Sequence, residues 1–256
     1  MDMRDILIYF AIKYEGDYEL IKRAIKDKER VGLDELTNIL KSVSSNTITI
    51  LDDNYPICLK QLYNPPFVLF YYGDISILNK VKALGVVGTR SPSSYGIEVT
   101  SYLLGDLLEK EDVVVVSGLA IGIDSLAHEI ALNKNRKTIA VLANGLDEYY
   151  IKNNLYLYNR IKENGLILSE YPSNSKVDKS KFRVRNRLIA ALSNAVLIPE
   201  ANIKSGTSIT INSAIELNKE ILCVPSSLLE KDSLTNYLIK EGAKCIFDYK
   251  DILDEL

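Results

Sequence analysis

Residues 113–132 read VVVVSGLAIGIDSLAHEIAL, in which an apolar run leads through a glycine-containing loop into a helical pattern. Four consecutive valines predict a strand that is buried on both faces, because a half-exposed strand would alternate apolar with polar residues. After Gly118 and Gly122, apolar residues recur at every third or fourth position, which is typical of a helix. The stretch therefore predicts one strand–loop–helix unit of a parallel sheet.

The same unit recurs along the chain. Apolar, β-prone runs alternate with helical patterns, and these runs occupy residues 83–88, 113–118, 138–145, 166–170, 195–200 and 220–226. Strands that alternate with helices indicate βαβ crossovers, so we expect an α/β protein with an open, doubly wound, mostly parallel sheet. Before them, helical patterns fill residues 1–42 and a polar break follows. We expect a small helical domain over residues 1–45 and a sheet-containing domain over residues 46–256.

The composition is that of an ordinary globular protein. Hydrophobic residues make up 47% of the 256 residues and charged residues 25%, and the formal net charge is −3. The three cysteines are too few and too scattered for a disulfide scaffold or a CxxC metal site. The N-terminus lacks a signal-peptide pattern, and no apolar run approaches the roughly 18 residues of a membrane span. We therefore expect a cytoplasmic protein with no membrane partner.

Six loops at the expected carboxyl ends of the strands form a candidate binding rim, because ligands of such sheets gather there. Four of the six contain glycine, and in three of these the glycine lies close to serine or threonine. Glycine lets the backbone approach a ligand, and amide groups at a helix N-terminus attract anions. In one loop, Arg90 either reaches the same anion or pairs with a neighbouring loop. The predicted anion-binding rim consists of residues 88–96, 117–124, 144–150, 169–173, 199–208 and 225–227.

A basic cluster opens one of the predicted helices. Residues 179–193 read KSKFRVRNRLIAALS, and residues 171–190 hold six Lys and Arg against one acid. Phe182 is either a ring that stacks on a base or a hydrophobic staple at the helix start. Because neither Arg185 nor Arg187 belongs to the apolar stripe, we expect their joint replacement by alanine to weaken anion binding without loss of folding. The predicted stripe consists of Val184, Leu188, Ile189 and Leu192.

Known catalytic motifs are missing from the sequence. There is no GxSxG, GxxxxGK[ST], HExxH or CxxC arrangement. The only histidine, His128, lies four residues after Asp124, and this spacing favours a structural polar contact over an acid–base pair. Asp124 or a neighbour is expected to cap the N-terminus of its helix. We expect a binding protein rather than an enzyme, with no catalytic residue, no metal site and no cofactor.

Several of these motifs together resemble the DNA-processing protein A family, also called Smf. The resemblance rests on LGVVGTRSPSSYG (84–96), SGLAIGIDSLAH (117–128), FRVRNRLIAALS (182–193) and SGTSIT (205–210), and it extends over roughly residues 55–243. It implies an extended Rossmann domain that binds and protects single-stranded DNA and helps load the bacterial strand-exchange recombinase in natural transformation and recombination. It also implies a homodimer. The C-terminal winged-helix module of many members has no counterpart in this sequence.

The resemblance also implies a groove for DNA and its phosphates, made from the family motifs and the basic and hydroxyl residues beside them. Three stretches depart from the family pattern. Tyr149 and Tyr150 stand where the family usually has Tyr-Pro, Ser226 follows Pro225 where the family usually has Gly, and residues 173–182 (SNSKVDKSKF) lack the prolines often found before that Phe. The candidate residues are Gly88, Thr89, Arg90, Ser117, Gly118, Ala120, Gly122, Lys181, Arg183, Arg185, Asn186, Arg187, Ser205, Gly206 and Thr207.

Two other functions fit a fold of this kind. A phosphoribohydrolase-like enzyme would carry a catalytic Glu in a PGGxGTxxE pattern, but Thr210 occupies that position and a hydroxyl cannot replace a carboxylate. A regulator that binds a mononucleotide at the same rim would use the same loops. Ligand length separates the hypotheses, because a groove gains affinity with each added nucleotide and a closed pocket does not.

Overall fold

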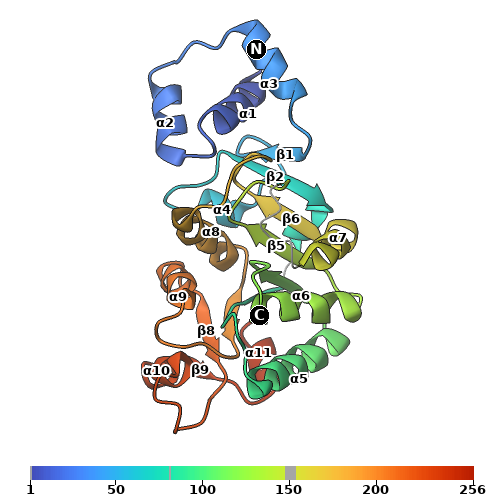
Figure 1. The fold of residues 1–256 in the computed structure, drawn as a ribbon, viewed down its shortest axis with the longest axis vertical. Helices are drawn as coiled ribbons and strands as arrows, with labels where there is room; N and C mark the ends of the chain where they lie inside the picture. The colour runs from blue at the N-terminus through green and yellow to red at the C-terminus, as the bar shows by residue number, and fades with distance from the viewer. Residues whose placement is uncertain (1, 81, 148–153) are drawn as a thin grey trace.

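Nine strands form one sheet in the described part of the chain, which is residues 2–80, 82–147 and 154–256 of a computed structural model (Figure 1). The strands are β1 Asn46–Thr49, β2 Val68–Gly73, β3 Ala83–Val86, β4 Val114–Ser117, β5 Thr138–Leu142, β6 Leu166–Ser169, β7 Ala195–Ile198, β8 Glu220–Cys223 and β9 Lys244–Cys245. Their order in the sheet is β1-β2-β6-β5-β4-β3-β7-β8-β9. β1 and β2 are antiparallel to their neighbours, and all other pairs are parallel.

Helices cover both faces of this sheet and the edge formed by β1 and β2 (Figure 1). They are α1 Met3–Lys13, α2 Tyr18–Lys26, α3 Leu33–Lys41, α4 Ile57–Lys60, the 3₁₀ helix Ile75–Asn79, α5 Ser94–Lys110, α6 Ile123–Asn133, α7 Leu155–Asn164, α8 Lys179–Ala191, α9 Thr207–Glu216, α10 Leu234–Lys240 and α11 Tyr249–Leu253. None of the helices in the described ranges is long and apolar enough to cross a membrane.

The parallel strands wind away from β3 in both directions. Leu84 of β3 is in register with Val115 of β4 on one side and with Ala195 of β7 on the other. The topological switch point therefore lies between β3 and β7, where open α/β sheets bind their ligands. The predicted α/β fold with a doubly wound, mostly parallel sheet is confirmed, and each of the six predicted runs contains one of the parallel strands.

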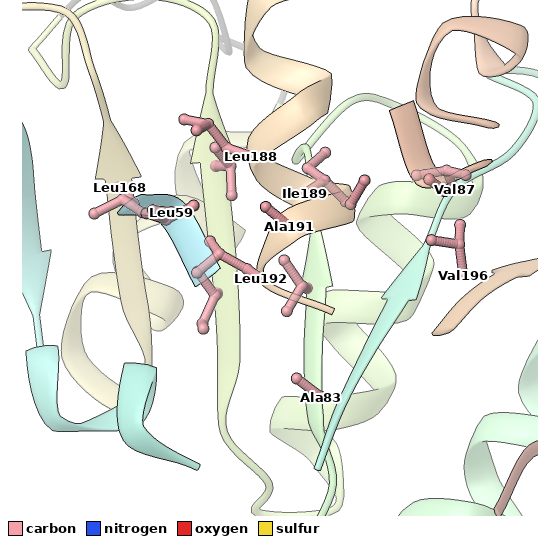
Figure 2. Packing of buried hydrophobic residues seen from close by; sticks show 14 of the residues in the cluster. Leu59, Ala83, Val87, Leu168, Leu188, Ile189, Ala191, Leu192 and Val196 are labelled. Atoms are coloured by element: carbon pink, nitrogen blue, oxygen red, sulfur yellow. The ribbon is translucent and has the colours of Figure 1, made fainter. Parts of the chain in front are cut away.

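Side chains of the parallel strands alternate between two buried cores. Val114 and Val116 belong to the core under α8 and α9, whereas Val115 belongs to the core under α5 and α6. Figure 2 shows Leu188 and Ile189 of α8 in the first of these cores, above the strands. Burial on both faces explains why the strands read as uninterrupted apolar runs.

The buried face of α8 differs from the predicted apolar stripe. Leu188, Ile189 and Leu192 are buried as expected, but Val184 is 40% exposed. Arg185 and Asn186 are buried in its place. The prediction was wrong at these positions because it ranked side chains by apolarity, whereas a polar side chain can be buried when neighbouring loops supply hydrogen-bond partners.

The N-terminal helices α1–α3 lie beyond the edge formed by β1 and β2 and pack against the sheet (Figure 1). Phe10 of α1 shares a buried cluster with Phe70 of β2. The turn between α1 and α2 also packs closely, because a Cβ on Gly16 would lie 2.4 Å from the Glu170 carbonyl oxygen. The domain boundary near residue 46 stays a prediction, and residues from both sides of it contribute to one core.

Candidate nucleic-acid interface

A cleft of about 740 Å³ opens at the switch point between β3 and β7. The loops after β3, β4 and β7 line this switch-point cleft together with one face of α8. The parallel arrangement causes this convergence, since the carboxyl ends of parallel strands share one edge of the sheet. The candidate residues that the structure brings together here are Gly88, Thr89, Arg90, Ala120, Arg185, Asn186, Ser205, Gly206 and Thr207.

Hydrogen bonds hold the loops of the cleft against one another. The Thr89 N–H donates to the Glu200 carbonyl at 2.8 Å, and the Ile123 N–H donates to the Thr89 carbonyl at 3.1 Å. The Glu200 carboxylate accepts from both the N–H and the hydroxyl of Ser93 at 3.0 Å. Gly122 has φ +88°, and a Cβ there would lie 2.3 Å from the Thr89 carbonyl oxygen. Only glycine fits where these two loops touch.

The lining of the cleft is positively charged. Four basic residues, Arg90, Lys179, Arg185 and Lys204, line it together with one acid, Asp124. The N-termini of α6 and α9 also reach the cleft, and neither has a side-chain cap. In α6 the N–H groups of Ile123 and Ser125 already donate to the Thr89 and Ala120 carbonyls, so what both helices share is the positive end of the helix dipole. The cleft therefore favours an anion, although the whole chain carries a formal charge of −3.

An aromatic ring lies among these charges. Phe182 of α8 lines the cleft, and its ring centroid is 5.6 Å from the Arg90 guanidinium carbon and 5.8 Å from that of Arg185. Cation–π attraction draws both guanidinium groups toward the ring. The ring is thus placed where a ligand in the cleft can contact it.

Arg185 is buried under the cleft, with only 4% of the residue exposed. Its Nη1 donates to the Gly118 carbonyl at 2.8 Å and to the Val141 carbonyl, and its Nε donates to Asn186 Oδ1 at 2.9 Å. Burial lowers the pKa of Arg185 to about 10, and the nearby Asp124 carboxylate opposes this shift. The expectation that Arg185 lies outside the buried face of α8 is therefore wrong, because loop carbonyls compensate for its burial.

Asp124 is buried beneath the same loop. Its carboxylate accepts a hydrogen bond from the Gly118 N–H at 3.2 Å. Burial raises the pKa of Asp124, while the charge of Arg185 acts in the opposite direction. The N-cap residue of α6 is Gly122, two positions earlier than Asp124. Asp124 thus stabilises the loop before the helix rather than capping the helix.

His128 makes a structural contact inside the core. Its Nδ1 lies 2.6 Å from Thr138 Oγ1, and the Thr138 hydroxyl donates to the Val115 carbonyl at 2.9 Å. Because that hydroxyl has only one proton, Nδ1 must be the donor to Thr138, which leaves Nε2 unprotonated. Burial lowers the pKa of His128 to about 3. The expected structural role is confirmed, with Thr138 rather than Asp124 as partner.

Two basic candidate residues lie in a different cleft, between the turn that joins α1 to α2 and the opposite face of α8. This second cleft has a volume of about 700 Å³ and includes Lys181 and Arg187. Arg187 Nη2 donates at 2.9 Å to both the Glu170 carboxylate and the Asn64 carbonyl. Lys181 Nζ is 3.7 Å from the Glu15 carboxylate. Both side chains therefore bind protein carboxylates.

The remaining candidate residues are absent from the linings of both clefts. Ser117 is buried, and its hydroxyl donates to the Val86 carbonyl at 2.6 Å. Gly118 lies directly against Arg185, since a Cβ on it would be 2.3 Å from Nη1. Arg183 is exposed on α8, between the helix face that lines the switch-point cleft and the helix face that lines the second cleft. The departure from the family at Tyr149 and Tyr150 lies outside the described residues.

The structure adds residues that sequence reasoning missed or left aside. Lys179 and Phe182 lie one turn apart on the face of α8 that lines the cleft. Their spacing of three residues is a sequence signal that could have predicted that they share one helix face. Lys204 adds charge from the loop after β7. Glu200 binds Ser93, and only the tertiary structure reveals that contact. Within the described ranges, no cluster of three or more His, Cys, Asp or Glu residues is arranged to hold a metal ion.

Comparison with known proteins gives consistent matches. A model of the DNA recombination-mediator protein A family matches residues 46–256. DNA processing protein DprA of Bacillus subtilis is 40% identical over 212 residues, which cover 82% of this chain and 71% of the relative. DprA of Streptococcus pneumoniae (strain ATCC BAA-255 / R6) is also 40% identical over 212 residues, which cover 82% of this chain and 73% of that relative.

Two solved structures are similar to this fold. DNA processing protein A from Streptococcus pneumoniae superposes with a TM-score of 0.87 at 30% identity, covering 100% of this chain and 99% of that one. The Helicobacter pylori protein gives a TM-score of 0.75 at 34% identity, covering 83% of this chain and 95% of that one. Because the family model spans most of the sequence and relatives are 40% identical, the chain belongs to the DNA recombination-mediator protein A family.

Proposed function

We propose that the switch-point cleft binds single-stranded DNA during DNA processing for recombination and natural transformation. The observation that carries the proposal is the lining of the cleft, which combines exposed Arg90, Lys179 and Lys204 with the ring of Phe182. Cations and helix N-termini attract phosphates, and an aromatic ring stacks on any base, so binding requires little sequence readout. The Helicobacter pylori relative has a single-stranded DNA binding mode, which supports the assignment.

In this proposal the protein protects exposed single strands and helps load the strand-exchange recombinase, and it acts as a homodimer. Its role is binding without catalysis. Family membership supports these parts of the proposal, and the geometry of the cleft supports the DNA-binding part. A single strand should be preferred over a duplex, because only an unpaired and unstacked base can turn its face to Phe182.

The test is fluorescence anisotropy with labelled oligonucleotides of increasing length, single- and double-stranded, over a range of salt concentrations. We expect affinity to rise with length and to fall with salt, with a slope of about −2 on a log–log plot if three cations each contact a phosphate. The control is Arg23→Ala, which removes a cation that lies on α2 outside the cleft lining. Saturable binding of a mononucleotide with no gain from added nucleotides would instead identify a mononucleotide-binding regulator.

A further inference from the structure

Glu200 binds the loop that carries Arg90 at two points. It follows β7, which pairs with β3, so it lies beside the loop that follows β3. Its main-chain carbonyl accepts from the N–H of Thr89, the residue before Arg90, at 2.8 Å. Its carboxylate accepts from the N–H and the hydroxyl of Ser93, three residues after Arg90, at 3.0 Å. One residue of the neighbouring strand therefore holds the loop on both sides of Arg90.

The place of the Glu200 carboxylate is built into the start of α5. Ser93 is the N-cap of this helix, and its hydroxyl accepts from the Gly96 N–H at 3.1 Å while it donates to Glu200. The carboxylate thus lies at the positive end of the α5 dipole. Gly96 leaves room for it, because a Cβ at that position would overlap Glu200 Oε2.

Arg90 itself depends on such support. Its side chain is exposed at the cleft, where its guanidinium carbon is 5.6 Å from the centroid of the Phe182 ring. A long side chain on a loose loop loses conformational freedom when it binds a ligand, and this loss lowers the affinity. A loop that is already fixed on both sides of Arg90 reduces the loss.

We propose that Glu200 is a positioning residue for single-stranded DNA binding, which acts by fixing the Arg90 loop. Glu200 itself is absent from the lining of the cleft. The inference rests on the proposed function and deepens it by giving an acidic residue a favourable role in binding an anionic strand. It also fixes the sign of the effect, because charge alone would make Glu200 repel the strand and its removal improve binding.

The first test is Glu200→Ala, measured by fluorescence anisotropy with a labelled single strand. We expect binding that is weaker by about three- to tenfold, since the freedom of one long side chain contributes of this order. Glu98→Ala is the matched control, because Glu98 is an exposed acid on α5 that does not line the cleft. Unchanged or tighter binding in Glu200→Ala overturns the proposal.

Gly96→Ala separates the position of the carboxylate from its charge. This variant keeps Glu200, but the new methyl group occupies the place of Oε2. We expect a loss of affinity similar to that of Glu200→Ala. Gly105→Ala on the same helix is the control, because a Cβ there has no other atom within 4 Å. Wild-type affinity in Gly96→Ala overturns the proposal, and this test also decides it if Glu200→Ala does not fold.

A double-mutant cycle with Arg90→Ala distinguishes positioning from a general structural role. If Glu200 acts through Arg90, Glu200→Ala should cause no further loss of affinity once Arg90 is alanine. Equal losses with and without Arg90 overturn the proposal, and urea denaturation reports the stability of each variant. A wild-type protein that binds no oligonucleotide contradicts the proposed function itself, and this outcome differs from a failure of the variants alone.

Discussion

The Arg90 guanidinium carbon lies 5.6 Å from the centroid of the Phe182 ring. Arg90 comes from the loop after β3 and Phe182 from the first turn of α8, so only the folded sheet brings them together. A guanidinium beside an aromatic face offers a nucleotide two different contacts, one for the phosphate and one for the base. Because only Arg90 is charged, salt dependence can distinguish the two contributions.

Arg90→Ala should weaken single-stranded DNA binding on every sequence. The loss of one phosphate contact should reduce the salt slope by about 0.7 and the affinity by about 1.5–3 kcal/mol. Anisotropy titrations at several salt concentrations measure both quantities. Arg23→Ala is the matched control, since it removes the same side chain from an exposed site on α2. An unchanged slope would mean that Arg90 contacts no phosphate.

Phe182→Leu should weaken binding by about 1–3 kcal/mol, because Leu lacks a ring for stacking on a base. The salt slope should stay the same, since no charge is lost. The measurement is the same anisotropy series, with urea denaturation in parallel. A loss of stability with full DNA affinity would show that Phe182 acts as a hydrophobic staple at the start of α8.

Arg187→Ala should destabilise the fold. The Glu170 side chain is only 5% exposed, and its ion pair with Arg187 has an N–O distance of 2.9 Å. Removal of the cation leaves a buried carboxylate without its partner, which costs about 3 kcal/mol in the free energy of unfolding. Urea denaturation measures this loss. Arg183→Ala, one turn earlier at an exposed position, should change stability by no more than about 0.5 kcal/mol.

Gly122→Ala should cost about 2 kcal/mol or more of stability, because a Cβ at φ +88° is strained and would lie 2.3 Å from the Thr89 carbonyl oxygen. Gly105→Ala is the contrasting control. Gly105 lies inside α5, and a Cβ added to it would have no other atom within 4 Å, so alanine should stabilise the helix by about 0.5–1 kcal/mol. Thermal unfolding of the two variants checks the opposite signs.

His128 should make stability depend on pH. Burial lowers the pKa of His128 to about 3, so below pH ~6.5 the unfolded chain binds a proton that the native state does not. The contribution is complete above pH ~6.5 and is lost as the pH falls, by about 2 kcal/mol between pH ~6.5 and ~5. Urea denaturation at these pH values should show this loss in the wild type. His128→Leu should lose about 2 kcal/mol less over the same interval, and equal losses would contradict the buried neutral histidine.

Much of the fold could be predicted from the sequence. Strands that are buried on both faces appear as uninterrupted apolar runs, and the alternation of these runs with helical patterns indicates a parallel α/β sheet. The convergence of the loops after β3, β4 and β7 followed for the same reason, since the carboxyl ends of parallel strands must share one edge. Residues 144–147, 169–173 and 225–227 of the predicted rim are absent from the lining of the switch-point cleft. The sequence also predicted a boundary at about residue 46, but it could not show that Phe10 packs in one core with Phe70. That contact depends on side-chain shape, which spacing alone does not describe.

The roles of the basic cluster were decided by tertiary structure alone. Along the sequence, Lys179, Arg183, Arg185 and Arg187 are equivalent cations in one short run. In the fold, Lys179 lines the cleft, Arg183 is exposed, and Arg187 pairs with Glu170. Arg185 is buried on the carbonyls of Gly118 and Val141. The sequence determined that positive charge gathers at the start of α8, but the helical turn and the partners from distant loops determined which charges a ligand can meet.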